Sequence, residues 1–149
     1  MNAMAGFGRL ARAQSSFGVP FTSDRFQPLP PQAVELARLA VAVCEVLADE
    51  DGASSEEAQV ALACAMLNRM RRFGPDEGGG GAAARAGVAD FGNPAFCRAF
   101  AVACLVMSGD CEDPTGGATH FHHHRKNPKW ARRAEPRALI GAHVFYVLG

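Results

Sequence analysis

Hydrophobic residues recur at helical spacing along the first half of the chain. One such stretch runs from about Gln32 to Ala48, and a second one continues to about Arg72. Pro31 suits the first turn of the first helix, because a helix leaves that backbone position without an N–H partner in any case. Ser54 and Glu57 have the spacing of a capping box, which predicts that the second helix begins there. We therefore expect a helical hairpin.

Farther along, the pattern changes from helix to short strands. A third helix is predicted to begin at Asn93-Pro94, an N-cap followed by a first-turn proline, and to extend through Met107, where Ser108-Gly109 ends it. Residues 118–123 and 142–147 alternate between apolar and polar side chains, which predicts two strands that pair with each other. The expected fold class is therefore α+β, with a mainly helical body and a small two-stranded β element near the C-terminus.

The length of 149 residues corresponds to one domain with a single core. Residues 1–31 lack periodicity and hold scattered Phe, Gly, Ser and Pro, so we expect an extended N-terminal arm or linker before a domain over residues 32–149. The arm carries too many phenylalanines for a purely solvated tail, which predicts that it lies on the domain or on a partner. These phenylalanines are Phe7, Phe17, Phe21 and Phe26.

Charge and cysteine content exclude several classes of function. Fifteen basic residues balance fifteen acidic ones, so no overall field favours nucleic acid or anionic lipid as a partner. No run of about 18 apolar residues occurs, and the first residues lack the apolar core of a signal peptide, so we expect no membrane span and a protein that is cytoplasmic as synthesised. The five cysteines include no CxxC pair, which argues against structural zinc. A disulfide between Cys111 and either Cys97 or Cys104 stays open.

A histidine cluster occupies the first predicted strand. His120, His122 and His124 would share one face of that strand, an arrangement that can present imidazoles to zinc. However, the chain has no HExxH motif, and a further ligand would have to come from elsewhere, such as His143 or Asp113. Surface or groove-lining histidines are the alternative, and we predict neither a metal nor a cofactor.

The segment from Asp113 to Tyr146 reads DPTGGATHFHHHRKNPKWARRAEPRALIGAHVFY. It holds, in order, DPTGGA, a strand of aromatic and histidine residues, Pro-x-Trp and Ile-Gly-x-His-x-Phe. Upstream lie Gln59-Val60-Ala61 and Leu67-Asn68-Arg69. In this order the motifs are similar to those of SleB-type cell wall hydrolases, and the resemblance covers the chain from about Leu36 on.

The resemblance implies a lysozyme-like, mostly helical fold and cleavage of the peptidoglycan glycan strand, by a muramidase or a lytic transglycosylase that leaves a 1,6-anhydro sugar. It places the single catalytic glutamate at Glu50. Glycoside cleavage needs a carboxylic acid that stays protonated near neutrality, and burial beside Asp49 and Asp51 would raise the pKa of Glu50. A solvated acidic turn is the alternative for these three residues. For substrate binding the resemblance points to His120 and His122.

Trp130 is the only tryptophan. It can offer a flat apolar face to a sugar ring, or it can anchor a core beneath a long loop. We include it among the candidate substrate-binding residues. Gly116 and Gly117 are expected to form a tight turn with positive φ, capped by Asp113.

Two departures from the family pattern favour a second hypothesis. The context Glu50-Asp51-Gly52-Ala53-Ser54 differs from the family's Glu-Ala-Arg-Gly-Glu, and residues 73–92 form a shorter, glycine-rich replacement for its substrate loop. The alternative is a catalytically reduced wall-binding or structural component of a phage-like particle, which would contact that particle or another protein through the N-terminal arm. In either case the protein would act at the cell wall after release or as part of a particle.

Overall fold

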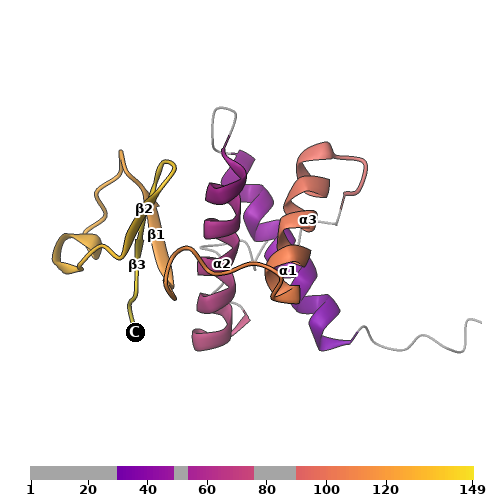
Figure 1. Ribbon diagram of the computed structural model, residues 1–149, viewed down its shortest axis with the longest axis horizontal. Coiled ribbons are helices and arrows are strands. Elements are labelled where there is room, and N and C mark those ends of the chain that lie inside the picture. The colour runs from indigo at the N-terminus through magenta and orange to yellow at the C-terminus, as the bar shows by residue number, and fades with distance from the viewer. Residues whose placement is uncertain (1–29, 49–53, 76–89) are drawn as a thin grey trace, which may run out of the picture.

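The computed structural model describes residues 30–48, 54–75 and 90–149 (Figure 1). In this part of the chain three α-helices precede a small antiparallel sheet, which confirms the α+β class with a helical body. In chain order the elements are α1 (Pro31–Ala48), α2 (Glu56–Phe73), α3 (Pro94–Ser108), β1 (His120–His123), the short 3-10 helix η4 (Ala131–Arg133), β2 (Ala138–Ile140) and β3 (His143–Tyr146). None of the helices in the described part has the length and apolar content that a membrane crossing requires.

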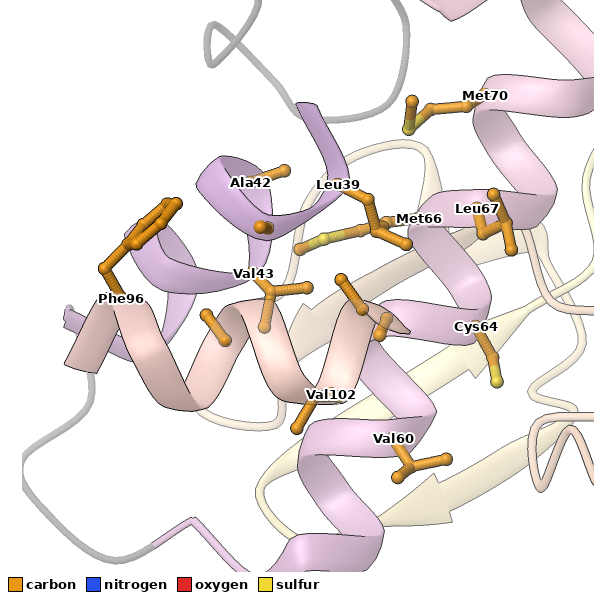
Figure 2. Packing of buried hydrophobic residues seen from close by; sticks show 14 residues of the cluster. Leu39, Ala42, Val43, Val60, Cys64, Met66, Leu67, Met70, Phe96 and Val102 are labelled. Atoms are coloured by element: carbon orange, nitrogen blue, oxygen red, sulfur yellow. The ribbon is translucent and has the colours of Figure 1, made fainter. Parts of the chain in front are cut away.

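The helices bury one apolar core among themselves. α1 packs along α3, and both contact α2. Figure 2 shows side chains from all three helices meeting there, with Leu39 and Val43 on α1, Met66 on α2, and Phe96 and Val102 on α3. Full burial of side chains of this size contributes about 1.5–3 kcal/mol each, so the helical body has its own source of stability.

Helix ends follow local sequence signals, with one shift. Asn93 caps α3 by accepting a hydrogen bond from the Ala95 backbone amide, and Gly109 ends the helix in the left-handed conformation at φ 78°, as expected. The predicted cap of α2 at Ser54 is wrong by one residue. Ser55 is the N-cap and accepts from the Ala58 amide at 3.2 Å, because the helix begins at Glu56.

The sheet has the strand order β1-β3-β2, and both pairings are antiparallel. The predicted pairing of β1 with β3 is confirmed, with His120 opposite Tyr146 and Phe121 opposite Phe145. The expected two-stranded element gains a third strand, β2, which pairs with β3 across a tight turn at Gly141. Gly141 has φ 59°, and a Cβ there would lie 2.9 Å from the Ala58 Cβ, so both the turn and the approach to α2 favour glycine.

One face of the sheet packs against α2, as Figure 1 shows on the side away from α1 and α3. Phe145 is completely buried there, in a cluster with Ala61, Leu62 and Ala65 of α2. Because side chains alternate along a strand, the neighbours of Phe121 and Phe145 point to the opposite face. That opposite face carries His120 and His122 of β1 and Tyr146 of β3.

Candidate functional site

Four aromatic side chains meet on the sheet face that points away from α2. Trp130 lies 5.6 Å from His120, 5.7 Å from His122 and 5.3 Å from Tyr146, measured between ring centroids. His122 stacks on Tyr146 at 5.4 Å. We call these four residues the aromatic cluster. The structure therefore brings together the three predicted substrate-binding residues, and it adds Tyr146, which sequence reasoning missed although the alternation of β3 places it on this face.

Hydrogen bonds fix the ring orientation of His122. Its Nδ1 lies 2.8 Å from the backbone carbonyl oxygen of His123, and its Nε2 lies 2.9 Å from the hydroxyl of Tyr146. Because a carbonyl only accepts, Nδ1 carries the hydrogen, and in the neutral ring Nε2 then accepts from the tyrosine hydroxyl. His122 is thus a positioned part of the face.

His120 keeps one nitrogen as an acceptor. The Thr119 hydroxyl donates to the Leu148 carbonyl at 2.9 Å, so its oxygen accepts from His120 Nδ1 at 3.0 Å. Nε2 of the neutral ring then remains able to accept a hydrogen bond, for example from a sugar hydroxyl. Burial lowers the pKa of His120, and the nearby charge of Arg69 lowers it further, so the neutral ring is favoured.

An open pocket of about 500 Å³ adjoins His120. It is lined by Arg69 and Phe73 of α2, by His120 of β1, and by Leu148 and Gly149. Phe73 is 42% exposed, and its ring meets that of His120 edge-on at 6.0 Å. The pocket therefore combines a cation, an exposed aromatic ring and a histidine acceptor, which are suitable contacts for a polar ligand with flat apolar faces.

Trp130 both packs and remains accessible. Its neighbour Ala131 is 7% exposed and begins η4, with its amide donating to the Pro128 carbonyl at 3.1 Å. Trp130 itself is 40% exposed while its ring contacts the other three members of the aromatic cluster. Both interpretations of this tryptophan thus have support: it anchors the loop between β1 and β2, and it presents a free aromatic surface.

Asp113 ties the sheet to α2. Its carboxylate accepts from the side chain of Asn68 at 2.9 Å, from the backbone amide and hydroxyl of Thr115 at 2.8 and 2.6 Å, and from the amide of Gly117 at 3.0 Å. Asn68 also donates to the Ala118 carbonyl at 3.1 Å. Burial by itself would raise the pKa of Asp113, but the hydrogen bonds outweigh it and lower the pKa below its ordinary value.

The glycine turn after Asp113 is confirmed. Gly116 has φ 63° and Gly117 has φ 86°, conformations that favour glycine, and Asp113 caps the turn as predicted. The sequence marked Asn68 and Asp113 only as parts of separate motifs. Their contact joins residues 45 positions apart, so no pattern of neighbouring residues predicts it.

The metal hypothesis for the histidines gains no geometric support. His120 and His122 share a face, but β1 ends at His123, and His124 Nδ1 instead lies 3.0 Å from the Ala142 carbonyl oxygen. Within residues 30–48, 54–75 and 90–149, no group of three or more His, Cys, Asp and Glu side chains is arranged to hold an ion.

All five cysteines have free thiols, so the possible bridge from Cys97 or Cys104 to Cys111 is not formed. The thiol beside Cys111 is instead that of Cys64. Burial raises the pKa of Cys64 to about 12, and the Asp113 carboxylate and Cys111 add to the effect.

Two predictions fall outside the described residues. They concern the catalytic Glu50, with its acidic neighbours Asp49 and Asp51, and the N-terminal arm up to residue 29.

Comparison with known proteins gave one match. Residues 82–146 fit a family model described as Cell Wall Hydrolase. The matched segment includes α3, the whole sheet and the aromatic cluster, and it ends at Tyr146. It does not include Glu50 or α2. Comparisons with curated proteins and with solved structures gave no match.

Proposed function

We propose that the chain cleaves the glycan strand of peptidoglycan. Residues 82–146 match the cell wall hydrolase family, which confirms the SleB-type resemblance and supports a peptidoglycan hydrolase role in general. In this proposal the enzyme is a muramidase or lytic transglycosylase of lysozyme-like fold, and Glu50 is its single catalytic acid. The observation that carries the proposal is the aromatic cluster of His120, His122, Trp130 and Tyr146 beside an open pocket, within or adjoining the matched segment.

The aromatic cluster suits sugar rings. The exposed part of Trp130 offers an apolar face on which the C–H face of a sugar packs, and exposed Phe73 offers a second one at the other side of His120. His120 Nε2 accepts a hydrogen bond from a sugar hydroxyl between them. His122 acts mainly by holding Tyr146 and Trp130 in place.

Glu50 supplies the chemistry in this proposal. Its carboxyl donates a proton to the bridging oxygen while the bond from that oxygen to C1 of the muramic acid breaks. In a transglycosylase the 6-hydroxyl of the same sugar attacks C1 and returns its proton to Glu50, which leaves a 1,6-anhydro end. In a muramidase water attacks instead and leaves a reducing end.

Mass spectrometry of the muropeptides released from purified sacculi tests the acid. Wild-type protein should release them, and Glu50→Gln should reduce release by about 10²–10⁴-fold, the usual contribution of a general acid. Glu112→Gln, an exposed carboxylate elsewhere, is the matched control and should retain full activity. If Glu50→Gln digests sacculi as fast as this control, Glu50 is not the acid. Anhydro or reducing ends in the products distinguish the two reaction types.

A binding measurement tests the aromatic cluster. Trp130→Ala should weaken cosedimentation with sacculi, because it removes the exposed ring and the support of His120 and His122. Leu139→Ala removes an apolar side chain that is 68% exposed on β2, outside the cluster, and should bind as wild type does. Equal binding by the two variants would contradict a sugar-binding role for Trp130.

The second candidate is a catalytically reduced wall-binding or structural component of a phage-like particle. The altered sequence around Glu50 and the short glycine-rich segment within 73–92 favour it. Its distinguishing result is cosedimentation of wild-type protein with sacculi, dependent on Trp130, without release of muropeptides. In both candidates the protein reaches the wall by release from the cell or within a particle.

A further inference from the structure

The loop between β1 and β2 concentrates positive charge. Residues 125–137 hold six of the fifteen basic residues of the chain and only one of its fifteen acidic residues, Glu135. All six basic side chains are exposed: Arg125, Lys126, Lys129, Arg132, Arg133 and Arg137. We call this segment the basic loop. Because the chain is neutral overall, the loop is a local positive surface on a molecule whose remainder is negative.

The basic loop is an ordered platform. The Lys126 amide donates to the His123 carbonyl at 2.8 Å, and the Arg137 amide donates to the Phe145 carbonyl at 2.7 Å, so both ends are pinned to the sheet. In the middle, buried Ala131 holds η4 against the body while Arg132 and Arg133 point outward into solvent. The backbone of the loop therefore does not have to become ordered when a ligand binds to these charges.

The basic side chains of the loop form no ion pair with an acidic side chain within the described residues. The ion pair found there, Arg71 with Glu35 at 3.5 Å, joins α2 to α1 and does not involve the basic loop. Figure 1 shows the loop at the end of the molecule farthest from α1 and α3. These charges are therefore accessible to an external anion.

The same loop carries Trp130, between Lys129 and η4, so the positive surface is continuous with the aromatic cluster. A ligand that satisfies both must present sugar rings and anionic groups side by side. A peptidoglycan strand does so, because stem peptides with free carboxylates branch from its sugars. A linear phosphodiester polymer would use the charges but would have no need of the aromatic face.

We propose that the basic loop binds the carboxylates of the stem peptides while the aromatic cluster binds the sugars from which they branch. This inference rests on the proposed function in one respect, the identity of the substrate as peptidoglycan. It assigns to Arg132 and Arg133 a specificity role: they favour strands that still carry their stems over strands from which the stems have been removed.

Cosedimentation tests the proposal with protein carrying Glu50→Gln, so that turnover does not alter the substrate. The probes are intact sacculi and glycan strands that an amidase has stripped of their stems. Because the amidase leaves a free lactyl carboxylate on each muramic acid, these carboxylates are converted to neutral amides, and the strands are coupled to beads so that they sediment. Arg132→Gln with Arg133→Gln should bind intact sacculi about five-fold more weakly, the loss of two exposed ion pairs of about 0.5 kcal/mol each. The matched control, Arg71→Gln with Arg98→Gln, removes the same charge from exposed positions on α2 and α3 and should bind as the parent does.

Stripped strands should bind parent and loop variant equally, at about the level of the loop variant on intact sacculi, and the parent's advantage should fade as salt increases. The proposal is overturned if the loop variant matches the control on intact sacculi, or if the parent binds stripped strands as well as intact ones. It is also overturned if poly(glycerol phosphate), but not soluble stem peptide, displaces the parent. Muropeptide release by the wild-type protein is measured separately. If the protein binds strands in a stem-dependent way but releases no muropeptides, only the proposed chemistry is refuted.

Discussion

Replacing Asp113 by alanine should loosen the sheet from the helical body. In the native protein its carboxylate accepts four hydrogen bonds, one from Asn68 of α2 and three from Thr115 and Gly117 in the turn before β1. Thr115 is 1% exposed, so after the substitution water does not readily reach its donors. The variant therefore leaves several polar groups poorly satisfied.

The size of the effect follows from these contacts. A hydrogen bond to a charged group contributes about 1.5–3 kcal/mol. The four bonds share two oxygens of one half-buried carboxylate, so they do not add, and we expect a loss of about 3 kcal/mol in the free energy of unfolding. Glu112→Ala, the exposed neighbour, is the control and should cost less than about 0.5 kcal/mol.

The difference should depend on pH in a defined direction. The folded pKa of Asp113 lies below that of the unfolded chain, which is about 3.9. Its charge therefore stabilises the fold fully above that value, and the contribution is lost as pH falls through the folded pKa. Wild type and Asp113→Ala should differ most at neutral pH and less below about pH 3.

Urea unfolding checks the prediction, followed by fluorescence of the single tryptophan, Trp130, for the sheet side and by circular dichroism for the helices. The reasoning fails if Asp113→Ala is no less stable than Glu112→Ala at pH 7. It also fails if the difference between them stays constant down to about pH 2.5.

Three further predictions concern single side chains. Native Cys64 should resist modification by a maleimide at neutral pH, because its pKa is raised to about 12 and its side chain is buried. Exposed Cys97 should react. Mass spectrometry of the labelled peptides checks this, and modification of Cys64 before Cys97 would contradict it. Arg69→Gln should raise the pKa of His120, because it removes one of the two causes that lower it, and an NMR titration with no upward shift would refute that electrostatic contact. Phe145→Ala should cost about 3–5 kcal/mol in urea unfolding by leaving a cavity, and a loss below about 1 kcal/mol would be incompatible with its complete burial.

Local signals predicted most of the helical body. Asn93-Pro94 and Gly109 marked both ends of α3 correctly, because capping depends on neighbouring residues alone. The predicted N-cap of α2 was Ser54 rather than Ser55, because Glu57 lies three residues after Ser54, as in a capping box, whereas Ala58 lies three residues after Ser55. In the structure the Ser54 carbonyl instead accepts from the Gln59 side chain at 2.9 Å.

The strand β2 was missed because three residues are too few to show alternation. Its available signal was Gly141 between β-forming residues, a two-residue turn at which Ile140 pairs with His143. The pairing of β1 with β3 could be predicted, since both strands alternate over four or more residues. Pairing order within the sheet depends on packing against α2, which periodicity does not encode.

The candidate site is divided between two parts of the chain. The hydrogen bond between Asn68 and Asp113 is therefore expected to matter for function as well as for stability. The aromatic cluster and the basic loop lie in the segment that matches the cell wall hydrolase family. The proposed acid, Glu50, belongs in sequence to the connection between α1 and α2. An acid on one part acts on a sugar held by the other only if the two keep a fixed separation.

Two features of the described residues fix α2 relative to the sheet: the packing of Phe145 on Ala61, Leu62 and Ala65, and the hydrogen bonds of Asn68 to Asp113 and to the Ala118 carbonyl. The apolar contact tolerates small sliding, whereas paired hydrogen bonds of defined direction do not. If the proposed chemistry is correct, Asn68→Ala should therefore lower glycan cleavage more than it lowers sacculus binding. Each half of the site would persist in that variant while their relative position relaxes, so a parallel loss of binding and cleavage would show that the contact serves stability alone.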